Sequence, residues 1–165
     1  GENKMRIYAS QNAPFTIMYD SWKAHSRELV PMTPEEGRQN AEVILGKVLS
    51  NRKPPYSLAG GLFDVLEKSG GDMFKVSNDE IVSWVVKYFS LEGYDLFPAS
   101  ACAVSSLKQA LDAGIVKHDE TVMLNVTGGG MLGATRKGFI LKEPDLILSP
   151  DLPAEEIIAA VDKLF

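Results

Sequence analysis

The residues best suited to hold a ligand form a glycine-rich loop, Thr127-Gly128-Gly129-Gly130. Consecutive glycines let the backbone turn tightly and approach a ligand without a Cβ in the way. The hydroxyl of Thr127 would then be placed to hydrogen-bond a polar ring atom or a phosphate. The alternative is a flexible exit from a strand that binds nothing. Because the loop matches neither GxGxxG nor a Walker A motif, it does not predict nucleotide binding.

Other polar residues could also face a ligand, but each has a simpler structural explanation. Glu92, just before Gly93 at the expected end of a helix, could line a cleft or be an ordinary solvated carboxylate. Ser10-Gln11-Asn12 follows the first expected strand, where helix capping is the favoured role. The basic turns Asn51-Arg52-Lys53 and Arg136-Lys137 could meet an anion, although solvent-facing turns are more common.

No set of residues has the composition of a self-sufficient active site. His25 and His118 are isolated, without a His or Cys at metal-ligand spacing and without a nucleophile motif nearby. Cys102 stands between two alanines and is expected to pack as a small hydrophobe. The sequence therefore predicts a binding loop, no metal site, and no nucleophile paired with a base.

The elements that would position these residues alternate between strands and helices. The expected strands are 5–9, 43–49 (or an irregular extended stretch), 73–76, 121–126, 139–142 and 146–148. The expected helices are 14–25, 58–66, 77–92 with a Ser77–Glu80 capping box, 98–111, and a last one from Pro153. Such alternation predicts an α/β layer architecture around a mostly parallel sheet. In such sheets ligands bind beyond the carboxyl ends of the strands, where the glycine-rich loop would lie.

Composition limits the classes of protein that fit. The 165 residues suit one domain, and the single cysteine excludes a disulfide scaffold. No apolar run approaches the ~20 residues that a bilayer requires. With a net charge of −5 and no concentrated basic face, the chain does not predict a nucleic-acid partner. We expect a soluble cytoplasmic protein, with residues 26–40 forming a mobile connection of irregular structure or short helical turns.

An ordered set of segments between about Val48 and Ala134 carries a family resemblance. The segments are Asn51–Tyr56, then Glu92-Gly93 with Pro98-Ala99-Ser100-Ala101, then the loop Thr127–Gly130. Together they resemble the C-terminal part of pyridoxal-phosphate (PLP) enzymes with the tryptophan synthase β-type fold, of the threonine synthase family. The opening segment, from Arg6 to Trp22, is most similar to the cysteate synthases of that family.

The resemblance implies both a fold and a cofactor site. The fold would be a three-layer sandwich with a mostly parallel sheet, of which residues 1–165 are the incomplete C-terminal part of the large domain. PLP would be the cofactor, with Thr127 hydrogen-bonding its pyridine nitrogen and with Gly128, Gly129, Gly130 and Glu92 also at its site. The family's Schiff-base lysine would lie in a part that precedes this chain, so no catalytic residue is assigned here.

The resemblance also implies an activity for the whole enzyme, although not for this chain alone. A PLP-dependent transferase or lyase of this kind would replace the phosphate of O-phospho-L-serine by sulfite and release L-cysteate, a step towards coenzyme M in some methanogens. It would act as a homo-oligomer. The alternatives are a threonine synthase acting on O-phosphohomoserine, a free-standing small-molecule binding domain, and a structural module whose glycines only turn the chain.

Overall fold

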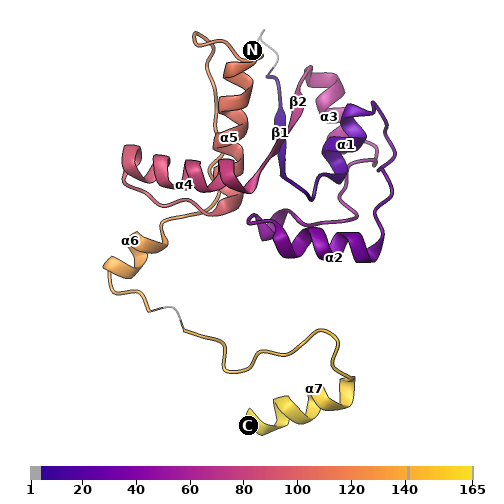
Figure 1. The fold of residues 1–165 in the computed structure, drawn as a ribbon, viewed down its shortest axis with the longest axis vertical. Helices are drawn as coiled ribbons and strands as arrows, with labels where there is room; N and C mark the ends of the chain where they lie inside the picture. The colour runs from indigo at the N-terminus through magenta and orange to yellow at the C-terminus, as the bar shows by residue number, and fades with distance from the viewer. Residues whose placement is uncertain (1–4, 141, 165) are drawn as a thin grey trace. The chain divides into compact units, whose positions relative to one another are not determined.

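The computed structural model describes residues 5–140 and 142–164. The chain divides into two compact units, 1–132 and 133–165. That the chain is one incomplete domain of a larger enzyme stays a prediction. The larger unit is α/β (Figure 1). In its described residues the sheet has two parallel strands, β1 (Tyr8–Asn12) and β2 (Asp72–Val76), paired from Tyr8↔Asp72 to Asn12↔Val76. The α/β class is confirmed, and the sheet is smaller than predicted.

The helices follow one another in the order that the sequence predicted, with two additions. The first three are α1 (Ile17–Lys23), α2 (Pro34–Val43) and α3 (Leu62–Ser69), and a 3-10 turn, η1 (Lys47–Leu49), follows α2. The next are α4 (Asn78–Glu92), α5 (Pro98–Asp112) and α6 (Met131–Arg136). The smaller unit ends with α7 (Ala154–Val161) and η2 (Asp162–Leu164). One addition is α2, because part of 26–40 forms a helix that begins with a capping box between Thr33 and Glu36, and the other is α6.

The predicted start and end of α4 are confirmed. The Ser77 hydroxyl accepts a hydrogen bond from the Glu80 N–H, and the Glu80 carboxylate accepts one from the Ser77 N–H. Gly93 ends the helix in the left-handed conformation that glycine adopts most readily. This helix is therefore fixed by local signals that the sequence displays directly.

Strand β1 begins and ends three residues later than the sequence predicted. Ser10-Gln11-Asn12 form the end of the strand instead of a turn, because Gln11 and Asn12 make long-range hydrogen bonds there. The Gln11 side-chain oxygen accepts the N–H groups of Met18 and Tyr19 at 2.8 and 2.9 Å, near the start of α1. Tertiary hydrogen bonds thus outweigh the turn preference of these polar residues.

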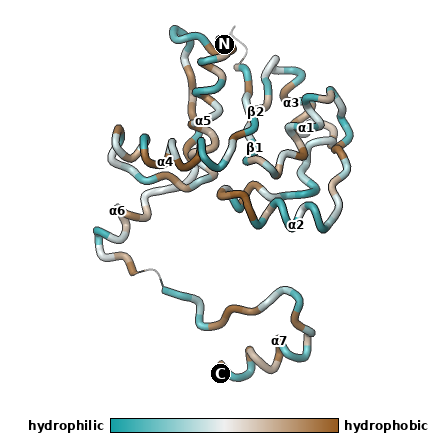
Figure 2. The backbone as a smooth tube through the Cα atoms, viewed as in Figure 1, coloured by the Kyte–Doolittle hydropathy of each residue, from teal (hydrophilic) through white to brown (hydrophobic). Residues whose placement is uncertain are grey.

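Four predicted strands are absent from the described residues. Residues 43–49 contain the end of α2 and η1, with Ile44 fully buried, so only the irregular alternative holds. Residues 121–126 are extended but have no ladder partner. Neither 139–140 nor 146–148 forms a strand, although the residues around Ile147 are apolar (Figure 2), and residue 141 lies outside the described residues. A strand needs a neighbour for its N–H and C=O groups, and among the residues that the structure describes none pairs with these segments.

Helix α5 lies across the sheet, packing against β1, β2 and α4 (Figure 1). Buried residues of α5 form one core cluster with residues of β2 and α4 and with Leu96. The cluster is Val76, Ile81, Leu96, Ala101, Cys102 and Val104. Cys102 is fully buried as predicted, and this burial raises the pKa of its thiol to about 11. Within the described ranges no helix is both long and apolar enough to cross a membrane.

The burial of Cys102 leads to a testable expectation about its reactivity. At mildly alkaline pH, iodoacetamide should alkylate the folded chain at least about 100-fold more slowly than the unfolded chain, because only the thiolate reacts and the raised pKa lowers its fraction by that factor. Mass spectrometry of timed samples, with and without guanidinium chloride, measures both rates. Equal rates in the two conditions would show that the thiol is accessible.

Candidate functional site

The glycine-rich loop lies beside the start of α5, at a hollow of about 340 Å³. Three segments of the larger unit line this hollow: Leu45–Val48, Phe97–Ser100, and Thr127 with Gly128. The structure therefore brings together two of the segments that carried the family resemblance, the one at 98–101 and the loop at 127–130. They are distant in sequence and adjacent in space.

Hydrogen bonds attach the loop to the segment that leads into α5. The Gly128 N–H donates to the Ser100 hydroxyl at 2.9 Å, and the Phe97 N–H donates to the Gly128 carbonyl at 3.2 Å. The Gly130 N–H donates to the Asp95 carbonyl at 3.0 Å. These three hydrogen bonds attach the loop to residues 95–100, about 30 positions earlier in the chain.

The close approach at Gly129 explains why that position must be glycine. Its φ is +149°, and a Cβ there would lie 2.1 Å from the Asp95 carbonyl oxygen, far inside a van der Waals contact. The backbone that Gly129 approaches is the chain's own, whereas the sequence had pointed to a ligand. Gly130, at φ +81°, has open space around the position of a Cβ.

Thr127 lines the hollow with an exposed side chain. No hydrogen bond of its hydroxyl is found in the described part of the chain, so the group can donate to or accept from a ligand. Phe97 supplies an aromatic wall of the same hollow. A free hydroxyl beside an apolar wall suits a flat heteroaromatic ring with a polar ring atom.

Glu92 lies apart from this hollow. It is the last residue of α4, its side chain is exposed, and it is not among the lining residues. Asp95, three residues later, is the acidic residue that supports the loop, since its carboxylate also accepts the Leu132 N–H at 3.3 Å. The cofactor role given to Glu92 stays a prediction.

Two supporting residues were not among the predicted site residues, Ser100 and Asp95. Ser100 is buried in the first turn of α5, two residues after Pro98. A serine in the first turn of a helix that begins with proline is the feature of the sequence that could have pointed to it. No feature of the sequence around Asp95 predicted its role, because that role depends on contacts with residues about 35 positions away.

The other polar candidates have structural roles. Gln11 caps α1, as the helix-capping explanation required, and its side-chain nitrogen is buried without a partner among the described residues. Asn12 is fully buried and hydrogen-bonds Gly46 and Val76. Arg52 packs its aliphatic stem over Gly37, and Arg136 and Lys137 are exposed.

The larger unit is thus an α/β fold with a hollow between a glycine-rich loop and the start of a helix. No protein-family model matches the chain. It is 37% identical to the cysteate synthase of Methanosarcina acetivorans over 160 residues, which is 95% of this chain and 38% of that protein. It is 37% identical to that of Methanocella paludicola over 164 residues (98% and 38%), and 41% identical to that of Methanosphaerula palustris over 128 residues (75% and 29%).

These relatives confirm the resemblance recognised in the sequence. Along nearly its whole length the chain is similar to cysteate synthases of methanogens. The chain spans 38% of the length of the first two of these relatives, so the similarity is to a part of each.

Proposed function

We propose that this chain is the C-terminal part of a PLP-dependent cysteate synthase. The whole enzyme would convert O-phospho-L-serine and sulfite to L-cysteate and phosphate, in the cytoplasm and as a homo-oligomer, within coenzyme M synthesis. The observation that carries the proposal is the 37% identity to a cysteate synthase over 95% of the chain. The three-layer sandwich belongs to the same proposal, with the two-stranded parallel sheet and the helix α5 on it as its part in this chain.

The residues at the small hollow fit one wall of a PLP site. Thr127 offers a hydroxyl to the ring nitrogen, Phe97 bounds the hollow beside it, and Ser100 fixes the loop by accepting the Gly128 N–H. When bound, PLP supplies the electron sink for replacement at the β carbon of an amino acid. A neutral hydroxyl as the partner of the ring nitrogen leaves that nitrogen unprotonated, which favours replacement over transamination. The Schiff-base lysine would come from another part of the enzyme, so this chain alone should be inactive.

Phosphate release by the whole enzyme tests the activity. We expect O-phosphoserine to yield phosphate and L-cysteate only when sulfite is present. O-Phosphohomoserine alone should release no phosphate. If phosphate appears only from O-phosphohomoserine, with threonine as the product, the enzyme is a threonine synthase and the proposal is wrong.

Replacing Thr127 by alanine in the whole enzyme tests the proposed role of its hydroxyl. Loss of one hydrogen bond should weaken PLP binding by about 10-fold and shift the absorbance band of the bound cofactor. Thr127→Ser, which keeps the hydroxyl, should restore both. Since the side chain is exposed, neither variant should change the thermal midpoint without cofactor. Unchanged affinity and absorbance in Thr127→Ala would remove Thr127 from the site.

A further inference from the structure

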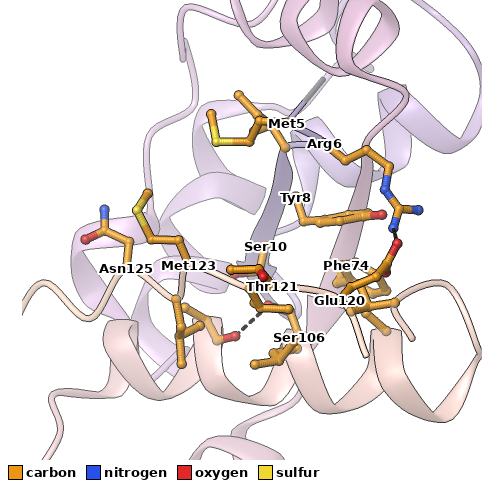
Figure 3. A pocket seen from close by; sticks show the side chains of 17 residues that line it. Met5, Arg6, Tyr8, Ser10, Phe74, Ser106, Glu120, Thr121, Met123 and Asn125 are labelled. Atoms are coloured by element: carbon orange, nitrogen blue, oxygen red, sulfur yellow. Dashed lines mark hydrogen bonds and ion pairs between the residues drawn. The ribbon is translucent and has the colours of Figure 1, made fainter. Parts of the chain in front are cut away.

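A second and larger hollow, of about 1020 Å³, lies between β1, helix α5 and residues 120–125, and Phe74 of β2 also lines it. One wall is β1 with the residues just before it, including Arg6, Tyr8 and Ser10 (Figure 3). The opposite wall is the extended segment 121–125, and the floor is helix α5, through Ala103, Ser106, Leu107 and Ala110. All of these residues belong to the larger unit.

Both walls are extended backbone without a partner on this side. In the described part of the chain β1 pairs with β2 alone. Segment 121–126 has the β-forming sequence Thr-Val-Met-Leu-Asn-Val but pairs with nothing, and Met123 is 82% exposed. Such rows of free N–H and C=O groups are templates for another strand.

The two walls run in the same direction. The Arg6 guanidinium donates to the Ile115 carbonyl and pairs with Glu120, which places the residue before β1 level with the start of 121–126. At the other end, Ser10 hydrogen-bonds Cys102 in the first half of α5, and Gly128 hydrogen-bonds Ser100 in its first turn. Both segments therefore run antiparallel to α5 and parallel to each other.

The hollow is large enough to hold a strand. A five-residue strand in a packed sheet occupies about 800 Å³, from a rise of ~3.3 Å per residue, a strand spacing of ~4.8 Å and a layer spacing of ~10 Å. The floor of small and apolar α5 residues leaves room for apolar side chains on the face of an inserted strand.

We propose that a single parallel β-strand, from the part of the enzyme that this chain does not include, docks between β1 and 121–126. The sheet would then have the order β2, β1, docked strand, 121–126. The occupant is assigned to the same polypeptide because the chain spans only 38% of its relatives' length. The inference shares with the proposed function the premise of a longer protein, but it does not depend on PLP or on the reaction.

The docked strand would also complete the smaller hollow. Running parallel to 121–126, it would end at the same edge of the sheet as the Thr127 loop, where ligands bind in parallel sheets. The residues after the docked strand would then face Thr127 and supply a second wall for the ligand. The 165-residue chain by itself offers only the wall formed by the loop and the start of α5.

Hydrogen–deuterium exchange in the whole enzyme without cofactor tests the docking independently of activity. Alternate amides of residues 121–126, those that face the docked strand, should exchange at least about 100-fold more slowly than in the 165-residue chain, because they would donate to that strand. Equal exchange in the two proteins would overturn the proposal. Protection in the 165-residue chain that rises with concentration, together with a dimer in light scattering, would assign the hollow to a second copy and also overturn it.

A matched pair of proline variants adds a second readout. Met123 and Ile147 are both 82% exposed, and neither lies in a helix or a strand. In the whole enzyme Met123→Pro should speed native-state proteolysis about 100-fold, because the proline ring removes a backbone donor and disturbs the pairing of 121–126 with the docked strand, while Ile147→Pro should leave it unchanged. In the 165-residue chain both should be neutral. If Ile147→Pro has the larger effect, the chain's own segment around Ile147 fills the hollow and the proposal fails.

Discussion

Replacing Asn12 by alanine should lower the free energy of unfolding of this chain by about 3 kcal/mol. The Asn12 side chain is fully buried at the end of β1. Its oxygen accepts the Gly46 N–H at 2.9 Å, and its nitrogen donates to the Val76 carbonyl at 3.0 Å and to the Asn78 side-chain oxygen at 3.1 Å. Truncation leaves these groups buried or partly buried without a partner, and each such group costs about 1–3 kcal/mol.

Urea unfolding followed by circular dichroism measures this loss. Asn51→Ala is the matched control, because Asn51 is exposed in a turn and should change the unfolding free energy by no more than about 0.5 kcal/mol. A loss below about 1 kcal/mol for Asn12→Ala would show that water or a shifted backbone replaces its hydrogen bonds.

Replacing Gly129 by alanine should weaken PLP binding by the whole enzyme by at least about 100-fold. The new Cβ would meet the Asp95 carbonyl oxygen, a backbone atom that cannot rotate away, and the φ of +149° is itself unfavourable for alanine. The loop must therefore move, and the movement would break the bonds from Gly128 to Ser100 and from Gly130 to Asp95. The orientation of the Thr127 hydroxyl is lost with them.

Two other glycines make a graded series with Gly129. Gly130 has a positive φ of +81°, but a Cβ there would meet no other atom. Gly130→Ala should therefore add only the strain of a left-handed alanine, about 1–2 kcal/mol, and should weaken PLP binding less than Gly129→Ala does. Gly133 lies in α6 with open space and no positive φ, so Gly133→Ala should bind PLP normally. Titration of PLP by absorbance ranks the three, and equal affinities for Gly129→Ala and Gly133→Ala would contradict the role of the close approach.

Five of the seven α-helices were predicted from this sequence because their signals are local, while α2 and α6 were missed. The Ser77–Glu80 capping box and Gly93 mark both ends of α4, and Pro98 marks the start of α5. Strand β2 was also predicted to within one residue of its start. In each case the residues that decide the structure lie within a few positions of the element.

Strands and supporting residues were predicted less well, because they depend on distant groups. The strand composition of 121–126 is real, but a strand also needs a neighbour, and none is present in the described chain. The end of β1 depends on bonds from Asn12 to Gly46 and Val76, 34 and 64 residues away. Ser100 and Asp95 support the loop across 28 and 37 residues, a distance over which spacing carries no information.

The pairing of β1 with β2 affects the timing of folding during protein synthesis. Asn12 and its partner Val76 are 64 residues apart. A ribosome that adds ~5–20 residues per second therefore makes β1 several seconds before β2. The two strands are parallel and cannot pair before β2 is made, so translation sets the earliest time at which the sheet can form. For those seconds only helices α1 to α3 are available to β1, and both edges of the strand stay open to pairing with the wrong segment.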